Sequence, residues 1–574
     1  MFIPTTQEEV RARGWGALDV ILVSGDTYTD NSYNGAAVVG HWLIDNGFRV
    51  GIIAQPRTDS GDDITRLGMP ELFWSVSAGC VDSMVANYTP TNKFRKDDDF
   101  TPGGVNNRRP DRACIAYSNL IKRFAKGKPI VLAGIEASLR RVAHYDAWSD
   151  TVRRSILFDA KADAIVYGMA ELSTLELANC MRDGRDWHSV RGICYISSER
   201  PDGHDEIPSF EECAADRGRF AEAFRMFYRS CDPVTSNGLC QRHGDRFLVQ
   251  NRPQRTVTPG ELDSIYESDY ENAVHPYYLR DGPVMAMETI RNSITTHRGC
   301  YGECSFCAIA VHQGRTVVSR SENSVIREVE RMASRPEFNG TIQDVGGPTA
   351  NMYGIECSVK TNKGACTDRR CLGGKPCPRM PIDHSRQIRL LERISAVPGV
   401  KRVFVNSGIR YDMILADRVN GQRYCDRIVG HHVSGQMKVA PEHVSPNVLK
   451  LMGKPSSDVL VQFKGMFDES NRRQGRRQFL TYYFMAAHPG CSDEDMRSLA
   501  DFCHTVLKTN PEQVQVFTPT PSTVSTMMYH TGRDMNGREV RSEHSMQRKQ
   551  RQKDIVVRRN APGSTKGRGN SVRR

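Results

Sequence analysis

The chain has 574 residues, of which 39% are hydrophobic and 25% are charged, enough for about three or four domains with apolar cores. The formal net charge is +11, but residues 541–574 hold eleven Lys and Arg against two acidic residues, a net of +9, so the basicity belongs to the C-terminal end. This composition excludes a fibrous or disordered protein, and the lack of a long apolar run or a secretory signal predicts a cytoplasmic protein with no membrane partner.

The first part of the chain alternates strand-like and helix-like segments. Residues 17–23 and 49–54 are short apolar runs, and residues 35–47 between them have the apolar spacing of a helix, which predicts a βαβ unit and a parallel sheet. A strand followed by Gly recurs at residues 129–134 and 164–168. We therefore predict a doubly wound α/β domain over residues 1–200, interrupted by a long polar loop at 85–113, and a bridging segment over residues 201–285.

The alternation restarts near residue 286. Six strands are predicted, followed or separated by helices, at residues 293–298, 341–345, 402–406, 436–440, 479–486 and 513–518. Repeated strand and helix pairs predict a partial (βα)6 barrel over residues 286–530. Beyond it, residues 531–574 are basic and lack periodicity, so we expect a disordered tail.

Seventeen cysteines in a chain without an export signal favour reduced thiols or metal ligands over disulfides. Three of them, Cys300, Cys304 and Cys307, lie within eight residues directly after a predicted strand. Soft thiolates on one short loop suit an iron–sulfur cluster, and only three ligands would leave one iron open. A zinc site with a distant fourth ligand and a chance grouping of cysteines are the alternatives at this point.

With Phe306 just before the last cysteine, this segment resembles the CxxxCx(aromatic)C signature of the radical S-adenosylmethionine (radical SAM) superfamily. The resemblance implies that Cys300, Cys304 and Cys307 hold a [4Fe-4S] cluster whose fourth iron is chelated by S-adenosyl-L-methionine. It further implies reductive cleavage of SAM to a 5′-deoxyadenosyl radical, with flavodoxin or ferredoxin as electron donor.

Other strand ends are similar to cofactor-contacting segments of this superfamily. Gly346 and Gly347 follow the second barrel strand, where the family has a Gly-Gly-Glu-like turn facing the SAM amino group, although Pro348 replaces the Glu. Ser407 and Arg410 end a later strand and resemble the polar segment near the SAM ribose and carboxylate. No catalytic acid or base is assigned.

A second group of cysteines, Cys357, Cys366, Cys371 and Cys377, falls in a polar insertion over residues 353–383. Four cysteines in a loop too polar to form its own core predict a closed metal site, either zinc or a second iron–sulfur cluster, with unligated thiols as the alternative. This pattern, together with the long N-terminal domain, resembles the YgiQ-type group of radical SAM proteins over nearly the whole chain. That group has no firmly assigned substrate.

A doubly wound domain ahead of the barrel is similar to the arrangement in cobalamin-dependent radical SAM proteins. The cobalt-ligating families have a DxHxxG motif in the first loop, whereas residues 25–35 here contain no histidine. Cobalamin can still bind without a protein ligand to cobalt, but we expect a scaffold or substrate-recognition domain instead.

The sequence thus predicts a radical SAM enzyme of unknown substrate. One alternative is an RNA-modifying radical SAM enzyme, in which the basic tail contacts phosphates of a nucleic acid. The other is a non-catalytic iron–sulfur redox or sensor protein, in which the open iron never binds SAM.

Overall fold

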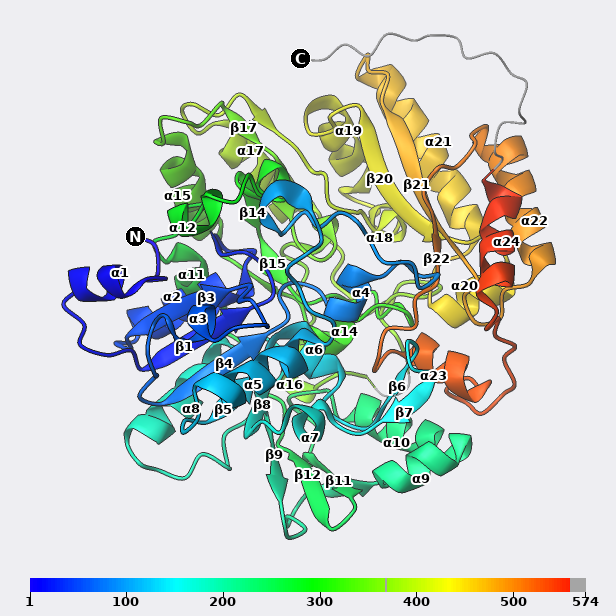
Figure 1. The fold of residues 1–574 in the computed structure, drawn as a ribbon. Coiled ribbons are helices and arrows are strands. Elements are labelled where there is room, and N and C mark those ends of the chain that lie inside the picture. Colours follow the sequence, from blue (N-terminus) through cyan, green and yellow to red (C-terminus); the bar gives the residue numbers. More distant parts are fainter. Residues whose placement is uncertain (367–368, 558–574) are drawn as a thin grey trace.

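The computed structural model describes residues 1–366 and 369–557. It shows two α/β bodies packed against each other, the N-terminal one in blue to green and the second in green to orange, with α24 in red (Figure 1). No helix in this part of the chain is long and apolar enough to span a membrane.

The N-terminal domain is built on a sheet that, within the described residues, has nine strands in the order β10-β11-β12-β9-β8-β5-β4-β1-β3. The neighbouring strands β3, β1, β4, β5 and β8 are parallel; their bounds are Val50–Ala54, Val20–Ser24, Phe73–Ser77, Ile130–Leu132 and Ala164–Val166. This is the flavodoxin-like strand order of a doubly wound sheet. Strand β3 is added on one side of β1 and β4 on the other, so the strand order reverses between β1 and β4. The predicted fold class is confirmed, and a ligand is expected where the strand order reverses.

Both faces of this sheet are buried. In β1, Val20 and Leu22 pack into one core with α2 (Gly35–Asp45) and α8 (Glu171–Arg182), while Ile21 and Val23 pack into another with α5 (Ala113–Phe124) and α7 (Ile156–Ala160). Successive side chains of a strand point to opposite faces, so helices on both sides require a continuous apolar run. That requirement explains the run at residues 17–23.

The structure moves the predicted domain boundary at residue 200. Part of the predicted bridging segment joins the N-terminal sheet as β10 (Asp205–Ile207), β11 (Leu239–His243) and β12 (Arg246–Gln250). Here β9 (Ile193–Ser197) pairs antiparallel with both β8 and β12. The sheet therefore continues to about residue 250. The segment between it and the barrel holds α11 (Pro259–Glu267), β13 (Ala273–Val274), α12 (Pro276–Leu279) and α13 (Met287–Ile290).

The six predicted barrel strands are present in the described residues and carry helices between them. The strand bounds are β14 Ser293–Thr295, β17 Thr341–Ile342 with β18 Asp344–Gly346, β19 Arg402–Val403, β20 Gln436–Glu442, β21 Phe479–Ala486 and β22 Val514–Val516. Parallel pairing links β14 to β18 and β17 to β19, and it links β21 to β20 on one side and to β22 on the other. No pairing in the described part joins β22 back to β14, so the barrel is open.

The outer layer of this barrel is helical. Its five longer helices between strands are α15 Glu322–Ala333, α17 Ser385–Ser395, α19 Gly421–His431, α21 Ser457–Arg473 and α22 Asp493–Phe502, counted over the described residues. They bury an apolar core that Ile294, Val345, Val439 and Phe484 supply from the strands. The arrangement matches the predicted partial (βα)6 barrel.

The disordered tail predicted for residues 531–574 is wrong for its first part. Residues Met546–Val556 form α24, which packs on α22, β21 and β22. Within α24, Lys549 is fully buried and donates to the hydroxyl of Tyr529 at 2.9 Å, while Arg551 pairs with Asp493 at 3.5 Å. These basic residues are engaged in the fold, and residues 558–574 lie outside the described residues.

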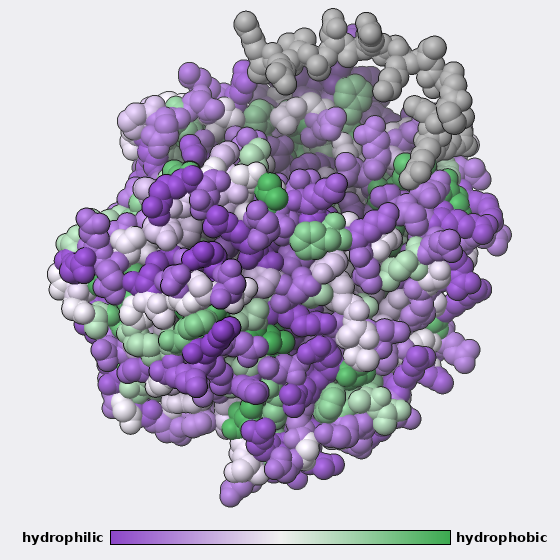
Figure 2. All heavy atoms as spheres, in the orientation of Figure 1, coloured by the Kyte–Doolittle hydropathy of each residue, from purple (hydrophilic) through white to green (hydrophobic). Residues whose placement is uncertain are grey.

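The helix before it, α23 (Val524–Thr531), belongs to the barrel in sequence but to the N-terminal domain in space. Val524, Met527 and Met528 lie in the same core as Trp74 and Ile165 of the N-terminal sheet. In Figure 1, α23 accordingly lies beside β6 (His144–Asp146) and α10 (Arg217–Arg229) at the lower right. The visible face of the whole molecule is mostly hydrophilic, with apolar side chains scattered among charged ones (Figure 2).

Candidate functional site

The three clustered cysteines lie on the loop between β15 (His297–Arg298) and α14 (Ile309–His312). The loop turns at Gly299, whose φ is +81° and whose missing Cβ would lie 2.0 Å from the carbonyl oxygen of Thr316, so only glycine fits there. The backbone N–H of Gly302 donates to Cys300 Sγ at 3.3 Å, and the N–H of Cys307 donates to the carbonyl of Cys304 at 3.0 Å. The loop is thus folded by its own hydrogen bonds.

Burial opposes ionisation of these thiols. It raises the pKa of Cys307 to about 12 and raises that of Cys300 as well. A thiolate at either position therefore needs a positive partner, and iron is such a partner. Each thiol of a cubane binds a different iron, so the three sulfur atoms need not converge as they would on a single ion. The donor set fits a [4Fe-4S] cluster.

Two buried cations flank the middle cysteine. Arg410 Nη1 lies 3.8 Å from Cys304 Sγ, and the same guanidinium forms an ion pair of 2.6 Å with Asp412. Lys454 pairs with Glu442 at 3.3 Å and lies 5.8 Å from the centre of the ring of Phe306. Burial would lower the pKa of Lys454, but Cys304 and Glu442 raise it, so its amine stays charged. Together these groups favour negative charge at the cysteine loop.

Phe306 connects the two bodies. Its ring is packed against both the barrel core and the core shared with the N-terminal domain, and it meets the ring of His488 edge-on at 6.2 Å. An aromatic side chain in the cysteine loop therefore fixes that loop to both domains.

The predicted SAM-contacting residues lie together at neighbouring strand ends. A Cβ on Gly346 would lie 3.0 Å from the hydroxyl of Ser407, and a Cβ on Gly347 would lie 2.6 Å from the ring of His297. Ser407 is held by Asp344, which accepts hydrogen bonds from its hydroxyl and from its backbone N–H at 3.0 Å. Gly346, Gly347 and Ser407 thus form one surface, while Arg410 lies closer to the cysteine loop. Their role in binding SAM stays a prediction.

The second group of cysteines is less compact. Cys357 and Cys371 are buried in a small core with Tyr301, whereas Cys366 and Cys377 are partly exposed. The backbone N–H of Cys377 donates to the carbonyl of Cys371 at 2.9 Å. Within residues 1–366 and 369–557, no three His, Cys, Asp or Glu side chains are arranged to hold a single metal ion. Metal or a second cluster at these four cysteines remains a prediction.

A cavity of about 390 Å³ lies between the two domains. One wall is the carboxyl edge of the N-terminal sheet, with Ser24 at the end of β1 and Ser77 at the end of β4, the two strands between which the strand order reverses. The opposite wall comes from the barrel and includes Gly347 and Ser407. The site therefore combines the ligand-binding edge of a doubly wound sheet with the strand ends of the barrel. We call it the interdomain cavity.

The wall of the interdomain cavity holds polar atoms with no partner. Among the described residues, Glu171 Oε2, His297 Nε2 and Arg298 Nη1 are buried and make no hydrogen bond. Glu171 and Arg298 are joined by an ion pair of 2.6 Å, yet each keeps one atom free. Burial lowers the pKa of His297 to about 4, so its ring is neutral at pH 7. Unsatisfied buried polar atoms are rare in native proteins, and here they favour a polar ligand.

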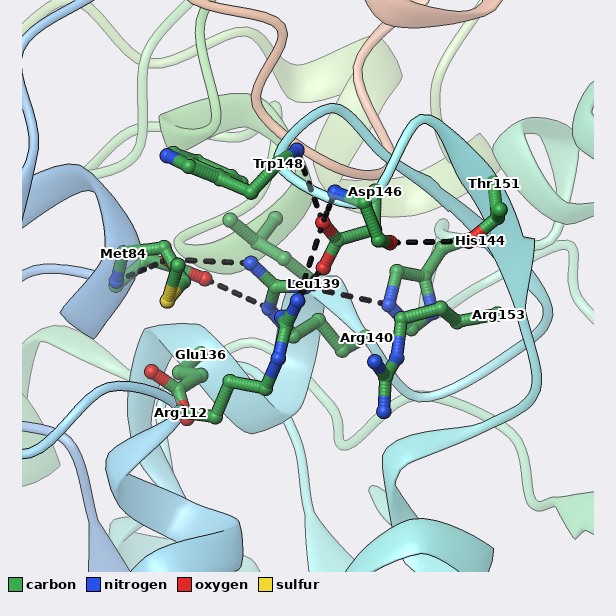
Figure 3. Close-up of polar contacts among 12 residues, drawn as sticks. Met84, Arg112, Glu136, Leu139, Arg140, His144, Asp146, Trp148, Thr151 and Arg153 are labelled. Atoms are coloured by element: carbon green, nitrogen blue, oxygen red, sulfur yellow. Dashed lines mark hydrogen bonds and ion pairs between the residues drawn. The ribbon is translucent and has the colours of Figure 1, made fainter. Parts of the chain in front are cut away.

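Helix α6 (Gly134–Leu139) positions the N-terminal wall. Gly134 lines the interdomain cavity, and Ser138 lies 3.1 Å from Nδ1 of His312, a barrel residue that also lines it. Just after the helix, Arg140 anchors the chain through a buried charge network (Figure 3): it pairs with Asp82 and with Asp146, each at 2.9 Å. Burial would raise the pKa of Asp146, but the guanidiniums of Arg140 and Arg112 outweigh it and hold that pKa well below its usual range.

Sequence reasoning missed Lys454 and the Glu171–Arg298 pair as site residues. Lys454 follows Gly453, which ends α20 (Pro446–Met452) in a left-handed conformation, and no motif marks it. Glu171 and Arg298 lie 127 positions apart in the sequence, and only the domain interface brings them together. For Arg298 the sequence did offer a signal, because this charged residue ends the strand directly before the cysteine loop.

Comparison with known proteins shows which family this chain belongs to. Residues 2–293 match the family described as Radical SAM N-terminal, and residues 512–559 match DUF3362, a domain of unknown function. A UPF0313 protein of Fusobacterium nucleatum is 55% identical over 97% of this chain and 98% of its own length. The chain belongs to the UPF0313 family. UPF0313 proteins of Thermotoga maritima and Methanosarcina acetivorans are 46% and 45% identical over 97% and 95% of this chain, and 98% and 78% of their own lengths are covered.

Membership in the UPF0313 family confirms the resemblance to the radical SAM superfamily and to its YgiQ-type group. Among solved structures, the cobalamin-dependent radical SAM enzyme OxsB with aqua-cobalamin bound has a TM-score of 0.50 and 10% identity, covering 90% of this chain and 56% of OxsB. The radical SAM methyltransferase TsrM from Kitasatospora setae, with cobalamin and a [4Fe-4S] cluster bound, has a TM-score of 0.49 and 16% identity, covering 88% of this chain and 77% of TsrM.

At such low identity OxsB shows the fold alone. The fold is nevertheless one that holds cobalamin in OxsB, so the expectation that this chain does not bind cobalamin is not supported. The missing histidine in residues 25–35 is a poor guide, because it concerns one cobalt ligand rather than the whole binding surface.

Proposed function

We propose that this chain is a radical SAM enzyme in which Cys300, Cys304 and Cys307 bind a [4Fe-4S] cluster, SAM binds its open iron, and the substrate occupies the interdomain cavity. The observation that carries the proposal is the position of the cysteine loop. Arg298, just before the loop, and Ile309, just after it, line the same cavity as the predicted SAM-contacting residues Gly347 and Ser407.

When bound, the cluster supplies one electron that breaks a C–S bond of SAM, giving methionine and a 5′-deoxyadenosyl radical that abstracts hydrogen from the substrate. The electron comes from a donor such as flavodoxin or ferredoxin. Arg410 and Lys454 offset the negative charge of the cysteine loop. Gly347 leaves room beside His297, and the cavity would hold the substrate between the two domains.

The test is SAM cleavage by the full chain. The protein is purified and reconstituted without oxygen, then given dithionite and SAM, and 5′-deoxyadenosine is measured by mass spectrometry. We expect 5′-deoxyadenosine from the wild type, none from Cys304→Ala, and undiminished formation from the control Cys503→Ala, a buried cysteine of the barrel core. An intact cluster without 5′-deoxyadenosine would instead favour the non-catalytic redox or sensor protein.

RNA modification remains a second candidate for the substrate. It rests on the basic residues 558–574, which lie outside the described residues, because Lys549 and Arg551 of α24 are already engaged in the fold. Filter binding of RNA to the full chain and to a chain ending at residue 557 tests it. Equal affinities would exclude a role for the tail.

Cobalamin is a candidate second cofactor, favoured by the switch point between β1 and β4 in the wall of the interdomain cavity. Ultraviolet–visible titration of the reconstituted chain with aquacobalamin tests it. A saturable shift of the corrin absorption bands supports binding, and an unchanged spectrum with free cobalamin after gel filtration rejects it.

A further inference from the structure

A second, smaller cavity of about 110 Å³ lies beside the interdomain cavity and shares part of its wall, including Arg298 and His312. Four arginines line it, and its described lining contains no Asp or Glu; the arginines are Arg141, Arg255, Arg298 and Arg315. Burial lowers the pKa of His312 to about 4, so that ring adds no charge at pH 7. The lining therefore carries cationic side chains and no carboxylate among its described residues.

Two of these arginines already have carboxylate partners. Arg298 pairs with Glu171 at 2.6 Å and Arg255 pairs with Glu261 at 2.5 Å. Arg298 nevertheless keeps Nη1 buried and without a hydrogen bond among the described residues. Its side chain thus has a donor left for a ligand.

Arg141 is a buried cation with neutral partners. It is 1% exposed and lies between the rings of Tyr167 and Phe227, each 4.5 Å from its guanidinium carbon. Its Nε donates to Gln250 Oε1 at 2.8 Å and its Nη2 to Cys231 Sγ at 3.3 Å, and its Nη1 donates to the carbonyl of Ser138. No carboxylate of the described chain lies within ion-pair distance, in contrast to Arg140 next to it.

Arg315 repeats this pattern. Its guanidinium stacks on the ring of Tyr228 at 3.9 Å, and its Nη2 donates to the carbonyl oxygen of the same residue at 2.5 Å. Its Nε is buried and has no partner, and no carboxylate of the described chain forms an ion pair with it. Arg141 is buried and Arg315 is partly buried. Burying an unpaired charge is strongly unfavourable, so these two guanidiniums on one cavity favour a bound anion.

We propose that this small cavity binds a phosphate group. The planar guanidinium forms paired hydrogen bonds with phosphate oxygens, and Arg141 and Arg315, which form no ion pair in the described chain, match the charge of a phosphate dianion. Its volume of about 110 Å³ suits one such group rather than a whole metabolite. This assignment of the substrate class rests on the proposed function. Arg298 in the shared wall then orients a phosphorylated small molecule whose remaining part lies in the interdomain cavity.

The experiment is isothermal titration of the anaerobically purified full chain with inorganic phosphate, and separately with acetate, without SAM or reductant. We expect saturable binding of one phosphate per chain and much weaker binding of acetate. Arg315→Gln should weaken phosphate binding by about tenfold or more, since it removes a charged donor. The control Arg423→Gln, an exposed arginine on α19, should bind phosphate like the wild type.

No saturable phosphate binding, an unchanged affinity in Arg315→Gln, or equal affinity for acetate would overturn the phosphate site. Arg141→Gln is a second variant with the same expected loss, and its thermal midpoint reports whether it folds; if it does not, Arg315→Gln decides alone. The titration involves no SAM cleavage, so its failure leaves the radical SAM proposal standing, and failed SAM cleavage leaves the titration interpretable.

Discussion

Replacing Arg140 should destabilise the N-terminal domain much more than replacing a partly exposed arginine nearby. Its side chain is 4% exposed and pairs with Asp82 and Asp146, whose side chains are 2% and 0% exposed. In Arg140→Met, Asp146 keeps its ion pair of 2.6 Å with Arg112, but Asp82 has no other cation within ion-pair distance in the described chain. Breaking a buried pair on one side costs about 3–5 kcal/mol.

The matched control is Arg153→Met, because the side chain of Arg153 is 29% exposed and its partner Asp159 also pairs with Arg154. Its loss should stay within about 1 kcal/mol. Hydrogen exchange at α4 (Ser83–Asn87) and α6 measures the local opening free energy in each variant, since a chain of several domains does not unfold in two states.

The double variant Asp82→Asn, Arg140→Met separates charge from packing. Asn keeps the capping hydrogen bond that Asp82 accepts from the N–H of Met84 in α4 at 3.0 Å, but it removes the carboxylate that Arg140→Met leaves without a cation. We therefore expect the double variant to be more stable than Arg140→Met alone. An Arg140→Met protein within 1 kcal/mol of the wild type, or a double variant no more stable than the single one, would refute the charge argument.

Three further predictions concern the site and the pH range. Gly347→Ala places a Cβ 2.6 Å from the ring of His297. We expect 5′-deoxyadenosine formation to fall by about tenfold, while the free energy of unfolding falls by only about 1–3 kcal/mol. Undiminished 5′-deoxyadenosine formation would contradict the tight contact. Lys454→Met removes a cation beside the cysteine loop, so a chelator should strip iron about tenfold faster than from the control Lys450→Met, an exposed neighbour. Burial lowers the pKa of His443 to about 4 and that of His488 to about 3, so as the pH falls the unfolded chain binds protons before the folded chain does. The free energy of unfolding should therefore decline as the pH falls from 6.5 toward 4, by about 2 kcal/mol per histidine at pH 5. Equal thermal midpoints at pH 5 and 7.5 would contradict this.

Regular local patterns made much of the fold predictable. The barrel strands were found because each is a short apolar run before a turn, and the cysteine loop because its spacing is local. The pair Arg140 and Arg141 shows where such reasoning ends. The two residues are adjacent and identical, yet one is held by two carboxylates and the other by neutral groups alone. The difference comes from Asp82 and Gln250, which only the tertiary fold brings to them.

The helix α24 was missed for a related reason. Its sequence, MQRKQRQKDIV, is too polar for an apolar stripe to be visible, and Val556 is the one apolar residue among its three buried residues. It is held instead by Lys549 against Tyr529 and by Gln552, whose side chain accepts a hydrogen bond from Ala487 at 3.0 Å. Charged side chains with long apolar stems can cover a surface that composition alone assigns to solvent.

The placement of α23 has a consequence for biosynthesis. Its residues Val524 and Met527 complete a core whose other members include Trp74 and Ile165, so the domain translated first is finished by a segment translated among the last. Until then, apolar surface of that domain stays uncovered on the nascent chain, the condition under which chaperones are needed and aggregation competes with folding. Chains truncated before residue 524 should for this reason be recovered as inclusion bodies rather than as an isolated first domain.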